Sequence, residues 1–89
     1  MTSPIRFTLR ERDLLLNLLS IEPEIADRLK LSALKNNTVT INIDAAELDM
    51  LLGAIAADAN HTSNKKLQKE LDALYDRVDK ILQTHFSTN

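Results

Sequence analysis

The sequence predicts a mainly helical α+β domain of order β-α-α-β-α-α, with a minimal two-stranded sheet and four helices. Three observations predict it. Only three of the 89 residues are aromatic, which leaves a core of Leu, Ile and Ala, residues that favour helices. One stretch, 38–43, alternates in the manner of a strand, and two segments have the spacing of a helix capping box. A chain of this length is expected to form one small domain, residues 1–89.

The N-terminal half is predicted to contain one strand and two helices. Residues 5–7 alternate between apolar and polar side chains, as a short half-buried strand does. Thr8 and Glu11 have capping-box spacing and open a helix predicted over Leu9 to Leu19. The Ser20–Pro23 stretch ends it, because the residue before a proline avoids helical backbone, and Pro23 begins a helix to about Leu34. Its predicted buried face is Ile25, Ala26, Leu29 and Ala33.

Asn36 and Asn37 predict a turn, because asparagine tolerates left-handed backbone. The strand over 38–43 follows, with Val39, Ile41 and Ile43 on one face. A lone strand cannot satisfy its own backbone hydrogen bonds. Its partner is expected to be residues 4–7 of this chain or, as the alternative, the same strand of a neighbouring subunit.

The second capping box, Asp44 to Glu47, opens a third helix predicted over 45–59. This segment is apolar nearly all round, which is typical of a buried helix, so it is expected at the centre of the molecule. Gly53 lowers its helix propensity by roughly 1 kcal/mol. The expected compensation is the close approach of another element at that glycine.

A fourth helix is predicted from about residue 64 to 84 or beyond. Its apolar residues recur at alternating spacings of four and three, the seam typical of packed helices: Leu67, Leu71, Leu74, Val78 and Ile81. The polar connection over 60–64 is short, so this long C-terminal helix is expected to form an antiparallel hairpin with the third helix.

Residues 7–19 align without gaps with residues 43–55. Each segment runs from a strand end into a helix that begins with a capping box. Shared capping physics explains the likeness. A duplicated β-α-α unit, whose two strands pair side by side, is the alternative.

Composition limits the classes of function. The chain has no cysteine, which excludes disulfides, thiolate zinc sites and cysteine nucleophiles. Its net charge of −2 provides no global positive field. No apolar stretch reaches membrane-spanning length, and residues 1–4 carry no signal-peptide pattern. We therefore expect a soluble cytoplasmic protein without membrane contact, and no cofactor or metal is predicted.

The predicted function is non-catalytic: a protein-interaction or accessory domain, binding a protein partner or a second copy of itself as a homodimer. The candidate interaction surface is Tyr75, Leu82 and Phe86, on the apolar stripe of the last helix. The stripe also serves packing within the chain, and the two roles are compatible.

Two other functions remain open at this point. Nucleic-acid binding would use two basic clusters, a candidate anion contact at Lys65, Lys66 and Lys69 and a second group at Arg6, Arg10 and Arg12. The lysines can equally neutralise acidic groups around the preceding turn. A small metal- or carboxylate-dependent enzyme would use Asp58 and His61, which are three residues apart on one helical turn. A polar turn is the simpler interpretation of this pair.

Overall fold

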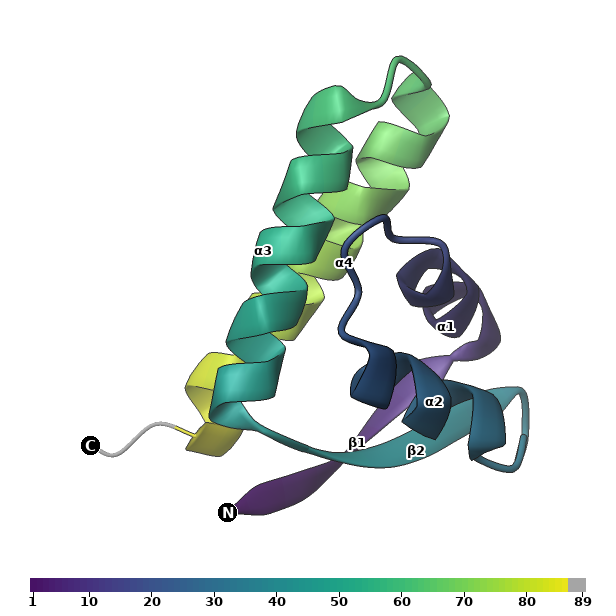
Figure 1. Ribbon diagram of the computed structural model, residues 1–89, viewed down its shortest axis with the longest axis vertical. Helices are drawn as coiled ribbons and strands as arrows, with labels where there is room; N and C mark the ends of the chain where they lie inside the picture. The colour runs from purple at the N-terminus through teal and green to yellow at the C-terminus, as the bar shows by residue number, and fades with distance from the viewer. Residues whose placement is uncertain (87–89) are drawn as a thin grey trace.

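The computed structural model describes residues 1–86, and Figure 1 shows their arrangement. The order is the one that the sequence predicts, with β1 pairing with β2 and α3 packing along α4. The elements are β1 (Thr2–Thr8), α1 (Leu9–Leu16), α2 (Pro23–Leu31), β2 (Thr38–Asp44), α3 (Ala45–His61) and α4 (Lys65–Phe86). No helix in the described part of the chain is both long and apolar enough to span a bilayer.

The two strands form an antiparallel ribbon within the chain, so no second copy is needed to pair them. The register places Thr2 opposite Asp44, Ile5 opposite Ile41 and Thr8 opposite Thr38. The inward face is the floor of the core, with five buried side chains: Ile5, Phe7, Val39, Ile41 and Ile43. The first strand is longer than the predicted 5–7, because residues 2–4 continue the pairing along β2.

The first two helices are shorter than predicted. The helix expected to reach Leu19 ends at Leu16, where the Asn17 side chain donates a hydrogen bond to the Asp13 carbonyl (2.7 Å). The helix expected to reach Leu34 ends at Leu31, because Ser32 is extended. Ala33 was predicted on the buried face and is exposed. The sequence showed apolar residues past both ends, but short loops carry those side chains.

The α3–α4 hairpin forms as predicted and projects away from the ribbon (Figure 1). Leu51, Leu52 and Ile55 of α3 are buried, which confirms the central position expected for that helix. On α4 the middle of the seam, Leu71, Leu74 and Val78, is buried, while Leu67 and Ile81 at its ends are partly buried. The Asn64 side chain caps α4 by accepting from the Leu67 amide (3.1 Å).

One expectation about α3 is wrong. Gly53 was expected to allow another element to approach, but it is exposed, and a Cβ placed there would meet no atom within 4 Å. Met50, one turn earlier, is 47% exposed. The helix therefore buries one face against the core and leaves an apolar face in solvent. The high apolar content of α3 therefore did not show that every face of this helix is buried.

The turn before β2 has the predicted backbone. Asn36 and Asn37 both have positive φ, of 54° and 61°. Asparagine reaches this region at lower cost than most side chains because it can form local hydrogen bonds. The turn brings β2 back alongside β1, and the Asn37 carbonyl accepts from the Leu9 amide (2.9 Å).

Candidate functional site

Networks of hydrogen-bonded polar groups surround the starts of α1 and α3. Both capping boxes predicted from sequence are formed. In the first, Thr8 Oγ1 accepts from the Glu11 amide (3.1 Å) and Glu11 Oε1 accepts from the Thr8 amide (2.8 Å). In the second, Asp44 and Glu47 make the same two bonds, at 2.8 and 3.1 Å. Each box ends a strand and fixes the direction in which the next helix leaves the ribbon.

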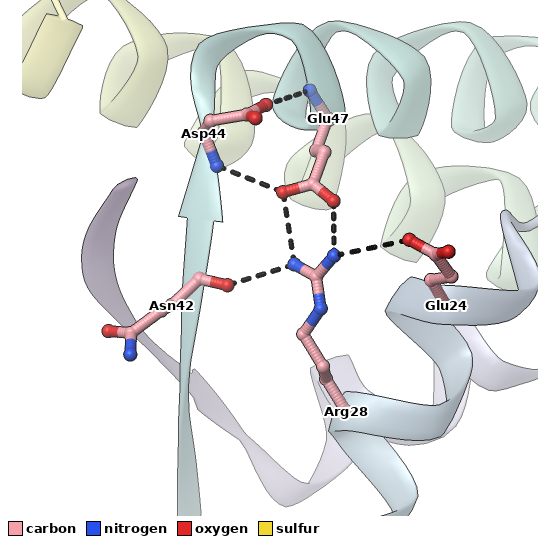
Figure 2. A network of polar contacts seen from close by, with 5 residues as sticks. All are labelled: Glu24, Arg28, Asn42, Asp44 and Glu47. Carbon is pink, nitrogen blue, oxygen red and sulfur yellow. Dashed lines mark hydrogen bonds and ion pairs between the residues drawn. The ribbon is translucent and has the colours of Figure 1, made fainter. Parts of the chain in front are cut away.

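An arginine from a distant helix closes the second box (Figure 2). Arg28, on α2, donates through Nη1 to the Asn42 carbonyl (2.9 Å) and to Glu47 Oε1 (3.0 Å). Its Nη2 bonds to Glu47 Oε2 and lies 4.0 Å from Glu24. The guanidinium thus satisfies a carbonyl on the outer edge of β2 and a carboxylate at the same time, the bidentate geometry that arginine favours.

A second arginine does the same at the first box. Arg77, on α4, donates through Nη1 to Glu11 Oε1 (2.8 Å) and through Nη2 to the Arg6 carbonyl (2.6 Å). Its guanidinium also lies 5.6 Å from the centre of the Phe7 ring, within the range of a cation–π contact. The outer edges of both strands are therefore each held by one arginine.

The two arrangements correspond at the two strands and capping boxes of the sequence alignment. In the alignment of 7–19 with 43–55, Glu11 matches Glu47, and extending it by one residue matches Arg6 with Asn42. Ile5 and Ile41, which also match, lie opposite each other in the ribbon. Each arginine comes from the second helix of one half and closes the box of the other half. The two arginines do not match each other in this alignment, which places Asn64 opposite Arg28, so both interpretations of the alignment stay open.

The contacts set the ionisation of the acidic groups. The hydrogen bond from Arg28 is the main cause that lowers the pKa of Glu47, helped by the Asp44 backbone. The same bond is the main cause that raises the pKa of Arg28. At the α1–α4 contact, the hydrogen bond from Arg10 lowers the pKa of Glu70 in the same way. Arg10 and Glu70 meet at 2.7 Å, but the Arg10 side chain is 61% exposed, so this pair is a surface contact.

The candidate interaction surface lies along one helix, but it is not uniformly open. Tyr75 is 36% exposed. Leu82 and Phe86 are only half-exposed, since both pack partly against the core. The larger exposed apolar side chains lie elsewhere, at Leu19, Leu31, Leu34 and Met50. The sequence did not single them out because each belongs to an apolar pattern typical of a core face.

The two basic clusters do not share one face. Lys65, Lys66 and Lys69 begin α4 at the tip of the hairpin, at the opposite end from the ribbon in Figure 1. Arg10 lies near these lysines, because its ion-pair partner Glu70 is on the second turn of α4. Arg12 lies 3.5 Å from Asp13, and Arg6 lies on the outer face of β1, away from both.

Asp58 and His61 line a small hollow at the same tip, together with Leu19. Asp58 Oδ2 accepts from the Leu19 amide (3.2 Å), so this carboxylate fastens the α1–α2 loop to α3. In residues 1–86 no three His, Cys, Asp or Glu side chains gather closely enough to hold a metal ion. The geometry assigns Asp58 a structural contact.

Sequence reasoning missed the two arginines that close the capping boxes. Arg28 lies 19 residues from Glu47, and Arg77 lies 66 residues from Glu11. The one available signal was the gapless alignment of the two halves, which places a glutamate at the same position of each box. No family model, no curated protein and no solved structure matches this chain.

Proposed function

We propose that this protein is a non-catalytic interaction domain that associates through the outward face of α3, with a second copy of itself as the first partner to test. One observation carries the proposal. Of the seven exposed residues of α3, four are small or apolar and recur at helical spacing, Ala46, Met50, Gly53 and Ala57; the other three, Asp49, Asn60 and His61, are polar. Exposed helix faces are ordinarily charged or polar.

Gly53 lies in the middle of this face. Glycine lowers helix propensity by about 1 kcal/mol relative to alanine, and no atom of the described chain comes within 4 Å of where its Cβ would be. The contacts within the chain therefore do not explain this residue. If α3 of a second copy crossed α3 of the first at Gly53, the two helices would pack closely there. Each copy would then cover the Met50 side chain of the other. An interface of this kind is isologous, with the same surface on both copies.

Light scattering after size exclusion, measured from about 5 to 500 μM, tests this proposal. We expect the mass to rise with concentration and Gly53→Glu to hold the protein at the monomer mass. This variant replaces glycine with a better helix former, so loss of folding does not account for a monomer. Ala33→Glu adds the same charge at an exposed loop position and is expected to leave the mass curve unchanged. A wild-type monomer throughout this range contradicts self-association.

The α4 surface of Tyr75, Leu82 and Phe86 is part of the same proposal, as the contact for a different protein partner. Its support is the Tyr75 ring, which is exposed beside two half-buried apolar side chains. Capture from cells with Tyr75→Ala as the matched bait tests it, and a partner retained by that bait excludes this surface. The cytoplasmic location expected from the sequence belongs to the proposal as well, and imaging of the tagged full chain tests it.

A further inference from the structure

The outer face of the β1–β2 ribbon is open to solvent. All four helices lie on the other side of the ribbon or beside it (Figure 1). The exposed side chains of the two strands lie opposite one another on this face: Arg6 is opposite Thr40, and Pro4 is opposite Asn42. Thr2 and Thr8 extend this face at the ends of β1. Hydroxyl, amide and guanidinium groups therefore lie side by side on this face, with Pro4 as the one apolar residue in the middle of the ribbon and Leu31 of α2 at its edge.

Two basic side chains, Arg6 and Lys35, line this face, although the chain carries a net charge of −2. Two shallow hollows meet at Arg6 and Thr40. One runs toward the end of α4 and is lined also by Arg77 and His85, and the other runs toward the turn before β2 and is lined also by Lys35. No carboxylate lines either hollow.

Three acidic residues near the ribbon are already engaged. Glu11 is held by Arg77 and Glu47 by Arg28, while Asp44, at the end of β2, caps α3. A fourth, Asp27 of α2, lines a separate hollow beside Thr40 and Asn42. The outward side chains in the middle of the ribbon itself, Pro4, Arg6, Thr40 and Asn42, include one cation and no carboxylate.

The shape and charge of this face match one polyanion. A two-stranded ribbon fits the major groove of B-form DNA, which is about 12 Å wide. Arginine and asparagine are the side chains that pair with guanine and adenine edges in that groove.

We propose that this outer face binds duplex DNA in the major groove. Arg6 and Asn42 contact base edges from the centre of the ribbon, and Lys35 and His85 contact phosphates toward its two ends. The deep, narrow major groove of A-form RNA does not admit such a ribbon. This site is separate from the α3 face, so either proposal can fail without the other.

Fluorescence anisotropy of the full chain with a labelled mixed-sequence 20-base-pair duplex tests the proposal, at about 20 to 200 mM salt. Binding is expected at the low end and is expected to weaken as salt rises. Arg6→Ala should weaken it about fivefold or more. Lys35→Ala should reduce the slope of log K against log salt by about 0.9, the value for one lost phosphate contact. Thr40→Glu, which places a carboxylate opposite Arg6, should abolish binding.

Lys69→Ala is the matched control, since it removes one positive charge at the far end of the hairpin, and it should leave the affinity unchanged. Every substituted side chain is exposed, so each variant is expected to fold. Circular dichroism of each variant checks this. Three outcomes overturn the proposal: no binding at the lowest salt, an equal loss for Lys69→Ala and Arg6→Ala, or equal affinity for a single strand of the same length. The second of these would instead assign binding to the lysines at the tip of α4.

Discussion

Replacing Glu47 with glutamine tests whether the arginine exchange stabilises the fold. The Glu47 carboxylate accepts from the Asp44 amide and takes both ends of the Arg28 guanidinium, and its side chain is only 17% exposed. Glutamine keeps the length and one oxygen. Its NH₂ group, however, turns one of the two acceptors that face Arg28 into a donor.

The expected loss follows from these contacts. A hydrogen bond to a charged group contributes about 1.5–3 kcal/mol, and removing one partner leaves the other unsatisfied. Arg28 retains the Asn42 carbonyl and the distant Glu24 carboxylate, so part of its hydrogen bonding remains. We expect Glu47→Gln to lower the free energy of unfolding by about 1–3 kcal/mol at pH 7.

The loss should depend on pH with a defined sign. Because Arg28 lowers the pKa of Glu47 in the folded protein, the folded state binds the proton less readily than the unfolded state. The stabilisation is fully present above the ordinary glutamate pKa of 4.5 and is lost as the pH falls through the folded-state value. The difference between wild type and Glu47→Gln should therefore shrink in acid.

Urea unfolding followed by circular dichroism, at pH 7 and at steps down to pH 3, measures both effects. Glu70→Gln is the control, since it removes a carboxylate from the more exposed pair with Arg10, and we expect it to lose less. A Glu47→Gln variant as stable as wild type at pH 7, or a loss that stays constant into acid, would refute the role given to this pair.

Three further predictions concern the core, the exposed face of α3 and the ion pair between α1 and α4. Leu52, whose side chain is 6% exposed, leaves a cavity when it is replaced by alanine, so Leu52→Ala should lower the free energy of unfolding by roughly 2–5 kcal/mol. A loss below about 1 kcal/mol in urea unfolding would contradict the central position of α3. Gly53→Ala should raise the unfolding free energy by about 1 kcal/mol at concentrations where the chain is monomeric, because the added methyl group meets no neighbour, and destabilisation there would show a contact at this position. A double-mutant cycle of Arg77→Ala and Glu11→Gln should give a coupling energy of about 1 kcal/mol, and strictly additive losses would mean that this ion pair contributes nothing.

The parts of the fold that depend on local sequence were predictable. Thr8 with Glu11 and Asp44 with Glu47 each lie within one helical turn, so their spacing alone identifies where α1 and α3 begin. The strand at β2 and the left-handed turn at Asn36 and Asn37 follow from single-residue preferences. The α3–α4 hairpin follows from the shortness of its connection.

The rest depends on contacts between residues far apart in the chain. Leu18 is buried and Leu34 is exposed. Both lie in loops, where the spacing of apolar residues along a helix does not predict burial. An approaching element was expected at Gly53 to compensate for the helix propensity that glycine loses, but sequence does not tell which face of the helix is covered, and Gly53 lies on the exposed one. Arg28 and Arg77 resemble ordinary surface arginines in sequence, and only the folded chain brings them to the two carboxylates.

Each half of the molecule supplies the arginine that binds the capping-box glutamate of the other half. A chain cut between α2 and β2 would leave two guanidinium groups and two glutamates without the contacts made here and would separate the two paired strands, so neither fragment is expected to keep its fold. Folding should consequently proceed in a single step, with no stable half-folded species. The same bonds would form equally well between the first half of one molecule and the second half of another, which gives this chain a built-in route to domain-swapped dimers when it is refolded at high concentration.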